Sequence, residues 1–170
     1  ESIQPEYAQA NGSKPQVRAE LTDVEHFASA DRAGIILIRR GETLMALRHD
    51  SSTPQVVKGV YFSPDEKDLW MKVNDTASLL MIDRQVRNKP PRLWILSTDT
   101  MSAVECLHSI PIGFRAKEQF SGFRPHSKDF LSIDTLNDKI TLWQETATDD
   151  QGCPIYVANT SLQNSASSFP

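Results

Sequence analysis

Two stretches of the chain, FSPDEKDLWMKVNDTASLLMI at 62–82 and FRPHSKDFLSIDTLNDKITLW at 123–143, align without a gap at an offset of 61 residues. The coinciding positions are an aromatic residue, a proline and a Lys-Asp pair: Phe62 with Phe123, Pro64 with Pro125, and Lys67-Asp68 with Lys128-Asp129. A third, partial copy, FASADRAGIILI at 27–38, covers only the second half of the unit. An internal repeat of this kind indicates one supersecondary unit used several times.

Each copy describes the same local structure. An apolar run ends in a turn that contains proline and charged residues, a second apolar run follows, and a polar turn leads into a third. Proline has its φ angle already set for the second position of a turn, and Asp and Asn tolerate left-handed backbone. The repeat therefore predicts an antiparallel meander of three strands.

The rest of the chain follows the same pattern. Short runs rich in Val, Ile, Leu, Phe and Trp alternate with Gly, Pro, Asp, Asn and Ser, which is typical of β-strands joined by hairpins. No amphipathic helix of ordinary length is visible, and only 100–108 could form a helical turn or two. The fold class is therefore all-β. The expected strands are 26–30, 35–39, 43–48, 56–62, 69–73, 78–82, 92–96, 106–110, 119–123, 130–133, 139–143 and 154–158.

The repeats resemble the WD40 family of β-propellers. The resemblance rests on GVYFSPDEKDLWMKVNDTASLLMID at 59–83, FSGFRPHSKDFLSIDTLNDKITLW at 120–143 and FASADRAGIILIRRGETLMALRH at 27–49. It implies antiparallel meander blades, about two to three of them, and hence a fragment, since a closed propeller needs at least about four. No Trp-Asp or Gly-His pair is present in the repeats, so the His–Ser–Asp–Trp hydrogen-bond set of the family is expected to be incomplete.

The resemblance also divides the chain. Residues 1–20 are predicted to be a flexible lead-in, 21–158 to form the propeller blades, and 159–170 to be a disordered tail or linker. The closing residues of the first two repeats, Ile38 and Ile82, are 44 residues apart, which fits the usual repeat of about 40–45. The next interval, to Trp143, is 61 residues, and we therefore expect an insertion near 84–105.

Composition and charge exclude several classes of protein. The 170 residues carry a formal charge of −4, which argues against a domain that binds nucleic acid through a basic surface. No apolar run approaches the roughly 20 residues that cross a bilayer, and the polar N-terminus contains no apolar signal core. The first residue is Glu rather than Met, so we expect that an upstream segment was removed.

The cysteines bear on the cellular compartment. Two isolated cysteines, Cys106 and Cys153, favour a reducing compartment and hence a cytoplasmic protein, although a single disulfide stays possible. Three Asn-x-Ser/Thr triplets, at Asn11, Asn74 and Asn159, point weakly to the alternative, a secreted protein.

No catalytic or cofactor-binding motif is present. The sequence lacks a glycine-rich phosphate loop, a Gly-x-Ser-x-Gly elbow and a His pair at metal-binding spacing, so we expect no enzyme, no cofactor and no metal. Asp83 and Asp134 are interpreted as hydrogen-bonding groups of turns or strand ends. The three tryptophans are expected to pack in the core: Trp70, Trp94 and Trp143.

The expected function is a non-catalytic platform for protein–protein interaction. The candidate contact residues belong to the basic cluster of the predicted insertion, because insertions in propellers lie on loops: Arg84, Arg87, Lys89 and Arg92. The expected partners are proteins or the remainder of the same propeller, with no nucleic acid and no membrane. Two alternatives stay open: a secreted or periplasmic β-sandwich that binds a ligand, and a propeller enzyme whose site lies outside this segment.

Overall fold

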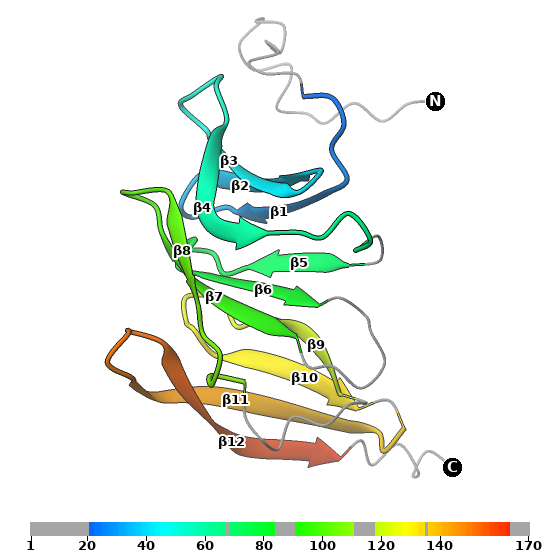
Figure 1. The fold of residues 1–170 in the computed structure, drawn as a ribbon. Coiled ribbons are helices and arrows are strands. Elements are labelled where there is room, and N and C mark those ends of the chain that lie inside the picture. Colours follow the sequence, from blue (N-terminus) through cyan, green and yellow to red (C-terminus); the bar gives the residue numbers. More distant parts are fainter. Residues whose placement is uncertain (1–20, 67–68, 84–90, 111–117, 135, 164–170) are drawn as a thin grey trace, which may run out of the picture.

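The computed structural model describes residues 21–66, 69–83, 91–110, 118–134 and 136–163. These residues form an all-β structure without a helix, so no helix in the described part of the chain is long and apolar enough to span a membrane (Figure 1). The strands are β1 (His26–Ala30), β2 (Ile35–Arg40), β3 (Thr43–Arg48), β4 (Gln55–Tyr61), β5 (Trp70–Val73), β6 (Leu79–Asp83), β7 (Arg92–Ser97), β8 (Ser102–Glu105), β9 (Glu118–Phe123), β10 (Phe130–Asp134), β11 (Lys139–Thr148) and β12 (Pro154–Gln163).

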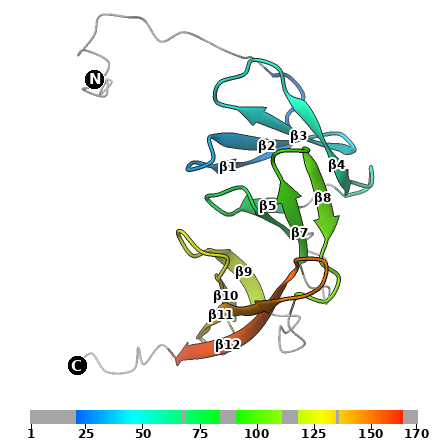
Figure 2. The same ribbon diagram turned by 90° about the vertical axis from the view of Figure 1, so that its left-hand side faces the viewer.

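The strands group into three antiparallel meanders of four strands, in chain order. We call β1–β4 the first meander, β5–β8 the middle meander and β9–β12 the third meander. Figure 1 shows them one below the other, and Figure 2 shows the initial strands β1, β5 and β9 following one another along one side. Contacts between β1 and β5, and between β5 and β9, agree with this view.

The first two meanders join into a single eight-stranded sheet. The connection is a short parallel pair between β4 and β8, where the backbone N–H of Lys58 donates to the carbonyl of Met101 at 2.9 Å. Gly59 beside it has a φ of +90°, and a Cβ there would lie 2.1 Å from the carbonyl oxygen of Ala103. This close approach therefore requires glycine. Because β1 also contacts β5, the eight strands form a nearly closed, barrel-like sheet.

The core consists of two layers, one on each face of the middle meander. Leu80 and Ile82 of β6 belong to the apolar cluster shared with the first meander. Leu79 and Met81, which point the other way because side chains alternate along a strand, belong to the cluster shared with the third meander. All four side chains are fully buried. The middle meander is thus covered on both faces.

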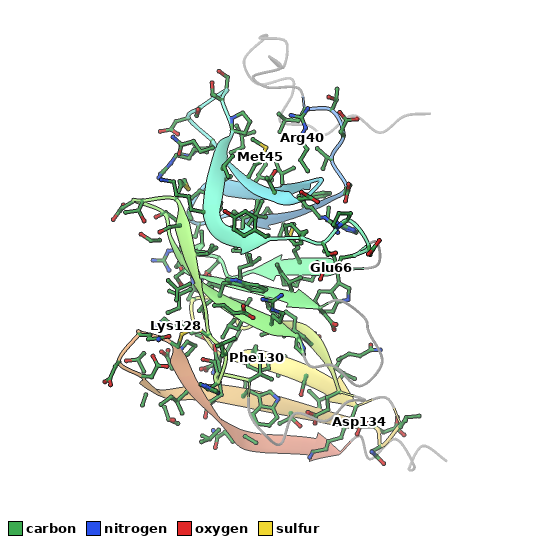
Figure 3. The ribbon with its side chains drawn as sticks, viewed as in Figure 1. Arg40, Met45, Glu66, Lys128, Phe130 and Asp134 are labelled. Carbon is green, nitrogen blue, oxygen red and sulfur yellow. A yellow bond between two sulfur atoms is a disulfide. The ribbon has the colours of Figure 1, made fainter. Side chains whose placement is uncertain are left out.

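The first and third meanders bury one face in the core and leave most of the other face accessible, although Ile38 on the outer face of the first is only 5% exposed. On the first, the outer face carries Phe27, Ile36 and Val56, all exposed, and Phe27 retains 69% of its accessible surface. Figure 3 places Met45, which pairs with Val56 on the same face, at this end of the molecule. On the third, Leu131 and Val157 are exposed on the face that points away from the middle meander. Both ends of the stack therefore present apolar side chains to solvent.

The hairpins that the repeat predicts are present. Antiparallel pairing joins β1 to β2, β5 to β6 and β10 to β11, with turns at the predicted polar residues. The Pro125 turn also joins β9 to β10 as expected. The equivalent Pro64 turn does not, and there the prediction is wrong: β4 pairs with β3, and the chain crosses to a different meander before β5 begins.

Buried Arg39 of β2 holds the Pro64 turn in this position. It donates to the carbonyls of Gly41 and Glu66, forms an ion pair of 3.0 Å with Glu25, and its guanidinium lies over the ring of Phe62 at 4.8 Å. The Pro64 turn is therefore bound to the first meander rather than closing a hairpin onto β5.

Other predicted boundaries also change. The possible helix at 100–108 is wrong, because β8 occupies Ser102–Glu105, and the strand expected at 106–110 is a turn that follows it. The stretch predicted as an insertion contains β7 and β8, both part of the middle meander. Likewise β12 continues to Gln163, which pairs with Lys139, so the first residues of the predicted tail lie in the sheet. The predicted lead-in, 1–20, lies outside the described residues.

Candidate functional site: the junction of three turns

The first hairpin turn of each meander meets the others on one side of the stack. The three turns are β1–β2, β5–β6 and β9–β10, and Figure 3 shows Lys128 of the third turn at one end of β10, with Asp134 at the opposite end. A backbone hydrogen bond of 3.0 Å from the N–H of Ala33 to the carbonyl of Asp75 connects the first two turns. This junction brings together residues that are more than 90 positions apart in sequence.

Asp75 is the central side chain of the junction. Its Oδ2 accepts from the backbone N–H of His126 at 3.0 Å and lies 2.9 Å from the Nδ1 of the same residue. Arg32 of the first turn reaches that Nδ1 at 3.0 Å. Nδ1 accepts from Arg32 when it carries no hydrogen and donates to Asp75 when it carries one, so the tautomer of the ring decides which of the two contacts is a hydrogen bond.

The β5–β6 turn presents Asp75 because Asn74 fixes its shape. The Oδ1 of Asn74 accepts from the backbone N–H groups of Ser78 at 2.8 Å and Leu79 at 2.9 Å. Its Nδ2 donates to the hydroxyls of Thr76 and Ser78. Asn74 is only 2% exposed, and Ala77 adopts a φ of +55°. An asparagine that satisfies the backbone locally is a common way of stabilising such a turn.

A shallow polar cavity of about 310 Å³ lies beside the junction, between the middle and third meanders. Its wall includes the hydroxyls of Thr76 and Ser78 and the ion pair of Lys128 with Glu145, at 3.1 Å. Tyr156 supports this wall from below by donating to the carbonyl of Lys128 at 2.7 Å. Burial, together with the nearby carboxylates of Glu145 and Asp129, raises the pKa of Tyr156 above its ordinary value. Tyr156 is therefore a neutral donor.

The polar groups of this junction are largely engaged with one another. The hydroxyls of Thr76 and Ser78 are bonded to Asn74, and no group of His, Cys, Asp and Glu side chains in the described residues has the geometry of a metal site. The Oδ1 of Asp75 is buried and accepts no hydrogen bond from the described residues. The surface around Asp75 carries the guanidinium of Arg32, the imidazole of His126 and the ion pair of Lys128 with Glu145. Such groups suit polar contacts with another protein.

The contact residues predicted from the sequence lie elsewhere. Arg84, Arg87 and Lys89 are outside the described residues. Arg92 begins β7 and makes a two-pronged ion pair with Glu105 of β8, while its guanidinium lies 4.7 Å above the ring of Trp94. The hydrogen bond to Glu105 raises the pKa of Arg92. This side chain is thus engaged within the middle meander.

Sequence reasoning missed the junction, although one signal pointed to it. Arg32, Asp75 and His126 each occupy the first turn of a meander, so stacking the meanders in register would have brought them together. The prediction for Asp134 holds. Asp134 accepts from the backbone of Leu136 and Asn137 in a turn. The tryptophans pack in the core: Trp94 and Trp143 are buried, and Trp70 stacks on Phe120 of the third meander.

A disulfide links the middle and third meanders. Cys106, directly after β8, bonds to Cys153, directly before β12, and the two α-carbons are 5.6 Å apart. Both cysteines are buried in the cluster between the two meanders. The sequence left open whether these cysteines are free, and the structure pairs them in a disulfide.

Comparison with known proteins gives no family. No protein-family model matches the chain, and no curated protein is similar to it at a significant level.

Proposed function

We propose that this chain belongs to a non-catalytic platform for protein–protein interaction, built as a WD40-like β-propeller from stacked four-stranded meanders. The observation that carries the proposal is the contrast in burial between the meanders. The middle one is covered on both faces, whereas the outer faces of the other two are apolar and exposed. Further meanders stacked at both ends would cover them, as neighbouring blades do in a propeller.

Two details of the third meander support the resemblance to WD40 repeats. The indole Nε1 of Trp143, at the closing position of the repeat, donates to the hydroxyl of Ser132 at 2.8 Å, and both residues are buried. This bond corresponds to the Trp–Ser part of the hydrogen-bond set that the resemblance implies. The strand order β9 to β12 also follows the repeat, with the proline turn between the first two strands.

The junction of three turns is the surface that the platform would present. It combines exposed polar side chains with a backbone held by hydrogen bonds, and binding residues commonly occupy turns supported by a rigid scaffold. The test introduces a photo-crosslinking residue at Arg32 and compares the crosslinked proteins with those captured from Asp138, in the exposed turn between β10 and β11. We expect one defined partner at Arg32, lost when Lys128 is changed to Glu. The same proteins at both positions would contradict the proposal.

The disulfide bears on where the platform works. Disulfides persist in oxidising compartments and are rare in the cytosol. Its buried position between two meanders supports the secreted alternative for the compartment over the cytoplasmic one. Titration of thiols in protein taken from its native source decides between the two: no free thiol is expected, and two free thiols would place the protein in a reducing compartment.

A further inference from the structure

Three asparagines of the chain stand in Asn-x-Ser/Thr triplets, and the structure separates them. Asn11 lies outside the described residues. Asn74 is buried, and its Nδ2, the atom to which a glycan would be attached, already donates to Thr76 and Ser78 inside the β5–β6 turn. Attaching a sugar there would break this turn and expose the backbone that Asn74 satisfies. Asn74 is therefore an unsuitable acceptor in the folded protein.

Asn159 has the opposite environment. It is exposed and lies on β12, which forms an edge of the four-stranded sheet. The register shifts at this point: Ala158 is opposite Trp143 and Thr160 is opposite Leu142, so Asn159 is the additional residue of a β-bulge. Bulges at sheet edges redirect side chains. The amide of Asn159 donates to the side chain of Gln144, and both side chains are at the surface.

The disulfide supplies an independent observation. Cys106 and Cys153 are buried and bonded, which points to folding in an oxidising compartment. In eukaryotic cells the enzyme that modifies Asn-x-Ser/Thr triplets acts in the same compartment in which disulfides form. A chain that acquires this disulfide during folding is therefore exposed to that enzyme.

We propose that Asn159 is a site of N-linked glycosylation. The co-reactant is an oligosaccharide carried on a lipid pyrophosphate. The Nδ2 of Asn159 attacks the anomeric carbon of the first sugar, a carbon–nitrogen bond forms, and the carbon–oxygen bond to the pyrophosphate breaks. Nδ2 loses one proton, and the lipid pyrophosphate leaves with the electron pair of the broken bond. No oxidant or reductant takes part.

The position of Asn159 also gives the glycan a physical role. An edge strand exposes unpaired backbone groups to which a strand of another molecule can add. A glycan on the bulge of β12 extends from the sheet edge and hinders such pairing. Because the glycan is attached at an edge strand, it does not cover the faces through which the meanders stack. The inference is thus independent of the proposed platform, and its failure would leave that proposal unchanged.

The test expresses the whole 170-residue chain behind a signal sequence in eukaryotic cells, in a background in which Asn11→Gln removes the undescribed triplet. We expect the secreted, disulfide-bonded protein to gain mobility on a gel after enzymatic deglycosylation. Mass spectrometry of the released peptide should show Asn159 converted to Asp and Asn74 unchanged.

Matched variants keep the test decisive even if one of them folds poorly. Ser161→Ala destroys the triplet but keeps Asn159. This variant and the separate variant Asn159→Gln should each abolish the mobility shift. Ser161→Thr preserves the triplet and should keep the shift. An unmodified Asn159 peptide in secreted, disulfide-bonded protein would overturn the inference, as would a glycan found on Asn74 in its place.

Discussion

The middle meander and the first meander contain nearly the same apolar run in their second strand, yet they bury it differently. In β6 the run is LLMI, and all four side chains are inaccessible. In β2 it is IILI, and Ile36 keeps 41% of its surface exposed. The difference arises because β6 lies between the first and third meanders, whereas no meander of the described residues covers the outer face of β2. A continuous apolar run predicts a strand buried on both faces, so β2 carries a sequence suited to a second neighbour.

Substituting one isoleucine in each strand gives the largest expected effect. Ile82→Ala in β6 removes a fully buried side chain, and should lower the free energy of unfolding by about 2–5 kcal/mol. Ile36→Ala in β2 is the matched control and should cost less than about 1 kcal/mol. Chemical denaturation of both variants measures the difference. Equal losses in the isolated chain would show that the outer face of the first meander is already covered.

Reducing the disulfide should weaken the third meander more than the first. The bond closes a loop across 47 residues, and its loss should lower the free energy of unfolding by about 2–4 kcal/mol. Hydrogen exchange with and without reductant should show β9–β12 losing protection while β1–β3 change little. The double variant Cys106→Ala/Cys153→Ala is the control, since it should not respond to reductant. Uniform loss of protection would mean that the three meanders unfold as one unit.

The turn that carries Asp75 should be far more sensitive than the β10–β11 turn of the third meander, which holds the polar turn residues of the other sequence repeat. Asn74→Ala leaves the buried N–H groups of Ser78 and Leu79 without their acceptor, which should cost about 1–3 kcal/mol. Asn137→Ala removes an exposed side chain that donates to Asp134 and should cost about 0.5 kcal/mol. Thermal unfolding of the pair measures both effects. A larger loss at Asn137 would reverse the comparison.

The smallest effect concerns pH. Because the folded state raises the pKa of Tyr156 above its unfolded value of 10.0, the unfolded chain releases this proton first as pH rises. The contribution of Tyr156 is therefore complete below pH 10 and declines as pH increases beyond it. Tyr156→Phe removes the hydrogen bond to the carbonyl of Lys128 and should lower the free energy of unfolding by about 1 kcal/mol at neutral pH. The stability of this variant should also depend less on alkaline pH than that of the unsubstituted chain.

Tyr61→Phe serves as the matched variant for the pH experiment, because Tyr61 is exposed on β4. It should leave the stability at neutral pH unchanged, because the ring of Tyr61 is exposed. An identical slope in Tyr156→Phe and in the unsubstituted chain would attribute the alkaline loss to other groups.

Local features of this fold were predictable from the sequence, and non-local ones were not. The strands and the polar turns follow from alternating apolar runs and from residues such as Asn74, whose effect reaches only five positions. The pairing of β4 was not predictable, because its partner depends on Arg39 holding the Pro64 turn against the first meander. The disulfide likewise depends on two meanders meeting, and a spacing of 47 residues carries no signal for that.

The candidate site shows the same limit. The basic run at 84–92 is predicted as a contact surface because its charges are close together in sequence. Its one described charged member, Arg92, is engaged by Glu105 and Trp94. Arg32, Asp75 and His126 share no local motif and meet only when three turns stack. Their common position in each meander becomes informative once the strand order is known.

The order of synthesis determines when the disulfide can form. Cys106 follows the last strand of the eight-stranded sheet, so that sheet can be complete while the partner thiol is still unmade. At a translation rate of about 5–20 residues per second, the 47 residues to Cys153 take roughly 2–9 s. During this interval the thiol of Cys106 lacks its partner, and the apolar face of the middle meander that packs on the third meander is uncovered.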